Sequence, residues 1–134
     1  MIDPVREHRP EPLRCTLGID VGGTKLAAGL LPLAGPAAWP TLVGPAMPPI
    51  LLGERTAATE PGRGGQAVLD DTVALAQAVM RDAGPDVQVE GIGLAVCELV
   101  DPQGNVTSGH TVAWAGCDVR AALAQVVPGG VPVV

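Results

Sequence analysis

Short apolar runs separated by turns rich in glycine and proline predict that strands and helices alternate along this chain. Two of these runs, Thr16–Asp20 and Lys25–Leu33, flank a Gly22-Gly23 pair and predict an antiparallel β-hairpin. The charged and proline-containing residues 1–14 predict a flexible lead-in before a single domain over residues 15–134.

Residues 34–64 are interrupted repeatedly by proline and glycine, and only an edge strand around Leu51–Ala58 is predicted there. Gly65–Ala83 shows the clearest helical period, with Leu69, Val73, Ala76, Met80 and Ala83 at three- and four-residue steps. Val87–Val96 alternates and then becomes almost wholly apolar, as a strand does inside a covered sheet.

The C-terminal part predicts a turn at residues 101–104, a strand at Asn105–Val112 and a helix at Val119–Val126. Asp118 is predicted to cap that helix, because its carboxylate can accept a first-turn N–H. Val131–Val134 predicts the start of a further strand.

Composition narrows the function classes. The formal net charge of -6 argues against nucleic acid as the main partner, since binding a phosphate backbone needs a basic surface. Three scattered cysteines form neither a disulfide framework nor a zinc motif. Neither a signal peptide nor a run long enough to span a bilayer is recognisable, so we expect a soluble, cytoplasmic protein with no membrane partner.

The hairpin turn carries residues suited to binding phosphate. We expect Gly22 and Gly23 to supply unusual backbone angles and close approach, Thr24 a hydroxyl donor, and Lys25 a positive charge. Asp20 ends the first strand and could hold Mg²⁺ through water. The order and the following strand fit neither a P-loop nor a dinucleotide-binding motif, and a plain Gly-Gly hairpin remains the alternative.

The longer string over residues 17–29, LGIDVGGTKLAAG, resembles the first phosphate motif of the ROK family of bacterial sugar kinases and repressors. Further resemblance lies in residues 90–104, in the Trp-containing residues 114–120 and in residues 131–134. It implies an α/β fold of the actin/hexokinase-like (ribonuclease H-like) ATPase superfamily, with a mixed sheet that starts with an antiparallel hairpin and has helices packed on it. The resemblance also implies ATP and Mg²⁺ as cofactors and a hexose as partner, and it leaves a homodimer open for the full-length protein.

Two departures from the family affect the predicted sugar side. Cys97-Glu98 stands where the family has Pro-Gly, and Glu98 could either hydrogen-bond a sugar hydroxyl or cap its own loop. His110 stands where many members carry a sugar-binding Asn, and it too could contact a hydroxyl. Cys97 is predicted to be a small buried filler.

The family's catalytic aspartate lies in an Asn-Asp-x-Asn motif, which the resemblance places beyond Val134. We therefore expect no catalytic residue in this chain, an incomplete domain at its C-terminus, and the N-terminal lobe of a glucokinase-like enzyme that is inactive alone. The alternatives are a ROK-type transcriptional regulator, for which residues 1–14 are too short to hold the DNA-binding part, and a non-catalytic sugar-binding remnant.

Overall fold

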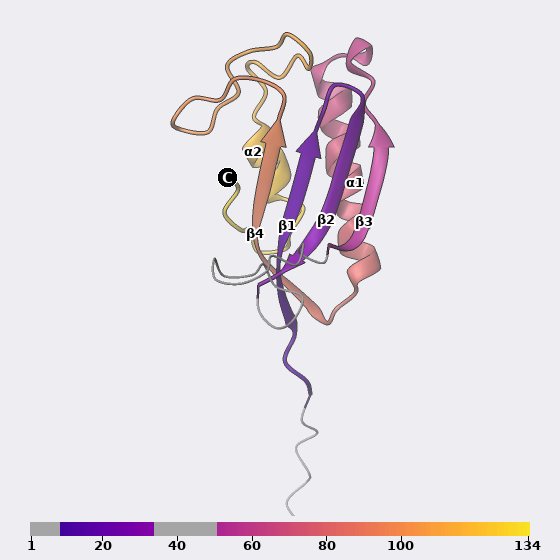
Figure 1. The fold of residues 1–134 in the computed structure, drawn as a ribbon. Coiled ribbons are helices and arrows are strands. Elements are labelled where there is room, and N and C mark those ends of the chain that lie inside the picture. Colours follow the sequence, from indigo (N-terminus) through magenta and orange to yellow (C-terminus); the bar gives the residue numbers. More distant parts are fainter. Residues whose placement is uncertain (1–8, 34–50) are drawn as a thin grey trace, which may run out of the picture.

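The computed structural model of the chain describes residues 9–33 and 51–134, which form one mixed sheet with two helices on one face (Figure 1). The strands and helices, in chain order, are β1 (Leu13–Val21), β2 (Lys25–Pro32), β3 (Leu52–Ala58), a 3₁₀ turn (Pro61–Arg63), α1 (Gly65–Ala83), β4 (Val87–Val96) and α2 (Val119–Ala124).

The sheet order is β3-β2-β1-β4, with β1 antiparallel to β2, β2 antiparallel to β3, and β1 parallel to β4. The connection from β3 through α1 to β4 allows that parallel pairing, because parallel neighbours need a crossover and a helix usually supplies it. The predicted mixed sheet beginning with an antiparallel hairpin is therefore confirmed.

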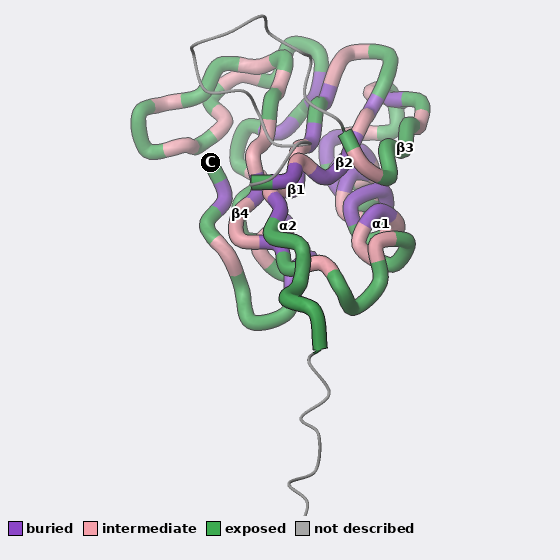
Figure 2. The backbone as a smooth tube through the Cα atoms, turned by 60° about the horizontal axis from the view of Figure 1, so that its bottom comes forward, coloured by how far each residue is buried: buried purple, intermediate pink, exposed green. Residues whose placement is uncertain are grey.

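The core lies between the sheet and the helices, where the buried positions of Figure 2 gather. Alternate residues of β1 face it, and β4 brings Val89 and Ile92 to the same side. The core contains no Phe or Tyr, so it is built from aliphatic side chains and the fully buried Trp114. The fully buried side chains of β1 and β2 are Cys15, Leu17, Val21, Leu26 and Leu30.

Helix α1 has the predicted bounds, and Gly84 at φ +73° ends it. Its buried stripe centres on Val68, Thr72, Ala76 and Val79, so the predicted stripe through Val73 and Met80 is rotated from the true one. Thr72 is fully buried because its hydroxyl donates to the Val68 carbonyl oxygen at 2.7 Å.

Three of the predicted segments differ from those in the structure. β1 begins at Leu13, inside the expected lead-in. The strand expected at Asn105–Val112 is a loop with a single bridge between Val100 and Val106. Val131–Val134 runs beside β4 but forms only an isolated bridge from Val133 to Ile92. These two segments lack regular pairing because each meets a neighbouring strand over too short a stretch.

Other expectations hold or lie outside the described residues. Asp118 caps α2, accepting the Ala121 N–H at 3.0 Å, although α2 ends at Ala124 rather than Val126. Residues 34–50, within the poorly patterned region 34–64, lie outside the described residues. Cys97 is exposed, so the prediction of a buried filler is wrong. No helix among the described residues has the length and apolarity needed to cross a membrane.

Candidate functional site

The carboxyl ends of β1 and β4 meet at one end of the sheet, because these strands are parallel neighbours and Val21 pairs with Val96. The β1–β2 turn and the long loop that follows β4 both lie at this end (Figure 1). Ligands of open α/β sheets bind outside the carboxyl ends of the strands, so this end is the place to look for a site.

The β1–β2 turn leaves two backbone donors available. The Gly22 N–H donates to the Lys25 carbonyl oxygen at 2.9 Å and closes the turn. The carbonyl oxygen of Thr24 accepts the Thr59 N–H at 2.9 Å, which ties the end of β3 to the turn. Neither the Gly23 nor the Thr24 N–H donates to any acceptor within residues 9–33 and 51–134. Two adjacent unpaired amides at a turn can bind an anion.

The two glycines of the turn are needed for space rather than for backbone angle. The expectation that they adopt unusual angles is wrong, because neither Gly22 nor Gly23 has a positive φ. A Cβ on Gly23 would instead lie 3.0 Å from the Cγ2 of Thr111, and one on Gly22 would lie 3.2 Å from the Lys25 carbonyl oxygen. The close approach expected of these glycines was to a phosphate, whereas these contacts lie within the chain, so that part of the expectation stays a prediction.

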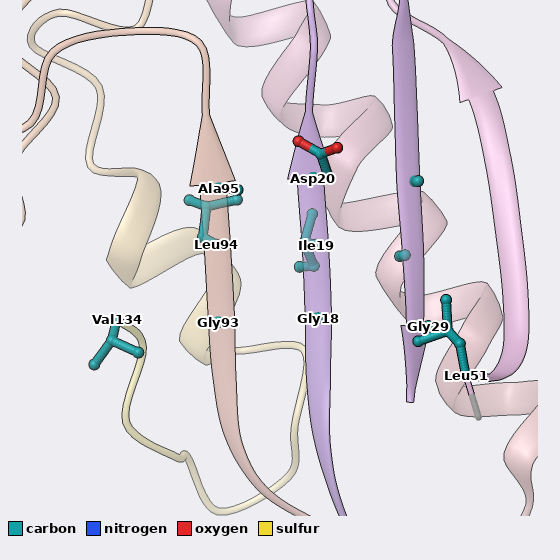
Figure 3. A pocket seen from close by; sticks show the side chains of 11 residues that line it. Gly18, Ile19, Asp20, Gly29, Leu51, Gly93, Leu94, Ala95 and Val134 are labelled. Atoms are coloured by element: carbon teal, nitrogen blue, oxygen red, sulfur yellow. The ribbon is translucent and has the colours of Figure 1, made fainter. Parts of the chain in front are cut away.

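The face of the sheet opposite the helices carries a shallow apolar trough next to Asp20 (Figure 3). Cross-strand pairing aligns Gly18 with Gly29 and with Gly93, so three strands in a row present no side chain. The trough has a volume of about 520 Å³, and Leu51 and Val134 also line it. Asp20 is exposed at the turn end of this face.

A magnesium ion at Asp20 would have to be held by one carboxylate, phosphate oxygens and water. The described residues contain no group of three or more His, Cys, Asp or Glu side chains that could hold a metal ion. Mg²⁺ binds in this sparse way in phosphate-transfer sites, through one or two carboxylates plus substrate phosphates. The exposed Asp20 therefore fits the predicted ion, whereas an all-protein metal cage is not present among these residues.

Glu98 lies just after β4, and its carboxylate is surrounded by donors from a single loop. Its Oε1 accepts the N–H groups of Thr111 at 2.6 Å and Val112 at 2.8 Å. Its Oε2 accepts the His110 N–H at 3.0 Å and the hydroxyl of Ser108. A carboxylate has about four acceptor positions, and all of them are used here. Of the two roles left open for Glu98, the geometry favours the loop cap.

These hydrogen bonds also set the charge state of Glu98. The Ser108 hydroxyl, followed by the backbone N–H groups of Val112 and Thr111, lowers the pKa of the Glu98 carboxyl from its ordinary value of 4.5 to about 2. Glu98 is therefore ionised at any physiological pH, and its charge is compensated by neutral donors.

The loop after β4 is folded back on itself between Glu98 and its donors. The Thr107 N–H donates to the Leu99 carbonyl oxygen at 2.8 Å, below the bridge between Val100 and Val106. At the tip, the side chain of Asp101 accepts the N–H groups of Gln103 and Asn105 at 2.9 and 2.8 Å. The predicted turn at residues 101–104 is thus confirmed.

Trp114 attaches the far side of the loop to helix α1. Its ring is fully buried, and its indole N–H donates to the Gly65 carbonyl oxygen at 2.9 Å. A Cβ on Gly65 would lie 1.9 Å from the Ala113 carbonyl oxygen, so the chain passes against the start of α1 without space for a side chain. The loop is therefore fixed at Glu98 and again at Trp114.

The structure brings the predicted phosphate residues together on one turn and places the loop of His110 beside it. Asp20, Thr24 and Lys25 are all exposed, and so is His110. The contact between the two regions is made by Thr111 against Gly23, which the sequence did not reveal. The sequence likewise did not point to Ser108 or Thr59 as residues of this region. Thr59 is buried, and its hydroxyl has no hydrogen-bond partner among the described residues.

Similarity to known proteins is found in solved structures. No protein-family model matches this sequence, and no curated protein gives a significant match. A ROK family glucokinase from Streptomyces griseus, in complex with glucose and AMPPNP, is 24% identical with a TM-score of 0.64, covering 90% of this chain and 32% of that one. The chain shares the fold of a ROK sugar kinase.

Two further structures agree. A ROK hexokinase from Thermus thermophilus is 24% identical with a TM-score of 0.64, covering 90% of this chain and 34% of that one. An inorganic polyphosphate/ATP-glucomannokinase from Arthrobacter sp. strain KM is 20% identical with a TM-score of 0.60, covering 90% of this chain and 44% of that one. The chain thus spans less than half the length of the sugar kinases it resembles, and the predicted fold class is confirmed.

Proposed function

We propose that this chain is the phosphate-binding and part of the sugar-binding portion of an ATP-dependent sugar kinase of the ROK type. One observation carries the proposal: the Gly23 and Thr24 N–H groups, which have no acceptor within residues 9–33 and 51–134, lie between an exposed aspartate and an exposed lysine, in a fold shared with ROK glucokinases. The Streptomyces griseus glucokinase was crystallised with glucose and an ATP analogue, which supports the same pair of ligands here.

In this proposal each residue of the turn has a defined task. The N–H groups of Gly23 and Thr24 donate to phosphate oxygens, and Lys25 adds a positive charge. Asp20 would hold the Mg²⁺ that accompanies ATP, through a water molecule. When bound, that ion would neutralise charge on the phosphates.

The sugar side rests on the loop after β4. His110 is exposed there and can donate to or accept from a hydroxyl, which makes it the proposed contact for a hexose. A sugar contact by Glu98 stays a prediction, and it would require one of the four hydrogen bonds to this carboxylate to open. None of these tasks is that of the catalytic base, which we propose is supplied from outside residues 1–134.

The test is a titration of the ¹⁵N-labelled protein with Mg-ATP, followed by the amide resonances of Gly23 and Thr24. We expect saturable shifts at these two amides. The affinity for Mg-ATP should fall at least about tenfold in Lys25→Gln and in Asp20→Asn, because each substitution removes a charged contact. Asp86→Asn is the matched control, since Asp86 precedes β4 at the opposite end of the sheet. Unchanged Gly23 and Thr24 resonances at saturating Mg-ATP would rule the proposal out.

A second titration addresses the sugar and turnover. Glucose and mannose should shift the amide resonances of His110 and Thr111 in the wild type and leave that of Thr111 unmoved in His110→Ala. No hexose phosphate should accumulate when both ligands are present. Turnover by this chain alone would contradict the placement of the base outside it.

A further inference from the structure

The position of Thr111 against the β1–β2 turn has a specific origin. Thr111 is exposed, yet its Cγ2 lies so close to Gly23 that a Cβ there would come within 3.0 Å. Since Gly23 has an ordinary backbone angle, this contact is the reason the structure offers for a glycine at that place. Thr111 therefore forms one wall of the turn that carries the Gly23 and Thr24 N–H groups, for which the described part of the chain offers no acceptor.

Thr111 is held in that position by Glu98. The Thr111 N–H donates to the carboxylate at 2.6 Å, and the neighbouring amides of His110 and Val112 bind the same group. Three consecutive N–H groups can converge on one point only in a sharply curved backbone, which a buried or fully bonded anion stabilises. Without that carboxylate, the three converging N–H groups would have no acceptor in this conformation.

The other restraints on the loop act elsewhere. Trp114 fixes the residues after Val112 to the start of α1, and the bridge between Val100 and Val106 closes the outer part. Neither restraint determines how residues 108–112 lie against Gly23. Among the described residues, Glu98 accepts four hydrogen bonds from this short segment, and the others are donated to it by the Leu99 N–H, to the Ser108 hydroxyl, and by the Trp114 N–H, to the Val112 carbonyl oxygen.

We propose that Glu98 is a positioning residue for the phosphate-binding turn: its carboxylate curves residues 108–112 so that Thr111 packs on Gly23 and shapes the site for nucleotide phosphates. This inference rests on the proposed function for its ligand. It also connects the two halves of the site, because the same carboxylate binds the backbone of His110, the proposed sugar contact. A change at Glu98 is therefore felt at both.

Two variants separate the steps of this mechanism. Glu98→Gln keeps the shape of the side chain but replaces one carboxylate oxygen by an NH₂ group. This group cannot accept hydrogen bonds, so the two that the oxygen accepted are lost. Thr111→Ser keeps the N–H that binds Glu98 but removes the methyl group that touches Gly23. Glu90→Gln is the control, because Glu90 also uses both oxygens, in a pair with Arg14 at the opposite end of β4.

Amide hydrogen exchange and the Mg-ATP titration provide the readouts. Glu98→Gln should speed exchange at Thr111 and Val112 at least about tenfold, as expected when local opening becomes easier, and should shift the Gly23 amide without nucleotide. Thr111→Ser should leave that exchange slow, yet still shift Gly23. Both variants should weaken Mg-ATP binding by about three- to tenfold, the range of one lost hydrogen bond or contact. Glu90→Gln should change none of these quantities.

The outcomes are distinguishable. The inference is overturned if Glu98→Gln opens the loop while the Gly23 amide and the Mg-ATP affinity stay as in the wild type. It is also overturned if Thr111→Ser, which keeps the clamp and should fold normally, leaves both unchanged. If the wild type fails to bind Mg-ATP, the proposed function falls, and the Gly23 shift in the absence of nucleotide alone decides whether Glu98 positions the turn.

Discussion

At the residue scale, glycines in this chain serve two different physical needs. Gly84 and Gly104 lie at positive φ, at +73° and +85°, where a side chain would strain the backbone. Gly23 and Gly65 have ordinary angles but lie against other parts of the chain. The second kind cannot be recognised from local sequence, since the neighbour that requires it is distant along the chain.

Gly65→Ala should therefore be the most damaging substitution among the glycines that the structure describes. The new methyl group would meet the Ala113 carbonyl oxygen, which belongs to the backbone and cannot rotate away. We expect a loss of about 3 kcal/mol or more in the free energy of unfolding, at the upper end of overpacking costs, measured by urea denaturation.

The matched control is Gly62→Ala, three residues before the first residue of α1, where the structure leaves open space for a methyl group. Gly62 has no positive φ, so alanine there should be neutral within about 0.5 kcal/mol, as for surface changes generally. Equal effects of the two substitutions would show that the close approach of Ala113 does not exist in solution.

At the scale of elements, the loop after β4 behaves as a folded unit because one carboxylate collects its donors. The stabilising effect of Glu98 depends on its charge, and the sign follows from its depressed pKa, about 2 in the folded chain against an ordinary 4.5. The contribution is complete above pH 4.5 and is lost as the pH falls through about 2.

An acid titration should show this at the loop itself. The amide resonance of Thr111 should move with a midpoint near pH 2, when Glu98 accepts a proton. Glu98→Gln should abolish the transition. The pKa of Asp101 is also lowered, chiefly by the Asn105 side chain, so Asp101→Asn serves as a control for protonation of that residue. This variant should leave the Thr111 titration curve unchanged. A midpoint near pH 4.5 would contradict the cap.

At the scale of the whole molecule, both helices cover one face of the sheet, and among the described residues no helix covers the other (Figure 1). The exposed ion pairs, such as Arg14 with Glu90 and Arg55 with Asp82, lie at the edges and add little to stability. Most of the stability therefore comes from the aliphatic core and Trp114.

Ligand binding should add measurably to this stability. If Mg-ATP binds the folded chain at the β1–β2 turn, a concentration of about 100 times Kd should stabilise it by about 2.7 kcal/mol. Thermal melting with and without Mg-ATP measures the effect, and Asp20→Asn, which binds at least about tenfold more weakly, should reduce it to about 1.4 kcal/mol or less at the same concentration. A melting temperature that does not respond to saturating nucleotide would count against the proposed site.

Much of the fold follows from periodicity. The bounds of α1 and β4 were predicted to the residue, because both have unbroken patterns that end at Gly84-Pro85 and at the polar turn after Val96. The prediction of a strand at Asn105–Val112 was wrong because residues of this segment hydrogen-bond to Glu98 and to the Leu99 carbonyl oxygen instead of pairing with a strand. Tertiary contacts there outweigh strand propensity.

What the sequence determined by itself is local: the hairpin, the long helix, the buried strand and the motif Asp20–Lys25, each encoded in neighbouring residues. What only the tertiary structure decided is which distant groups meet. Glu98 contacts residues ten to fourteen positions away, Trp114 reaches Gly65, and Thr111 packs on Gly23. Such pairings depend on how strands and loops are brought together in space, and no pattern along a single chain specifies a partner at that distance.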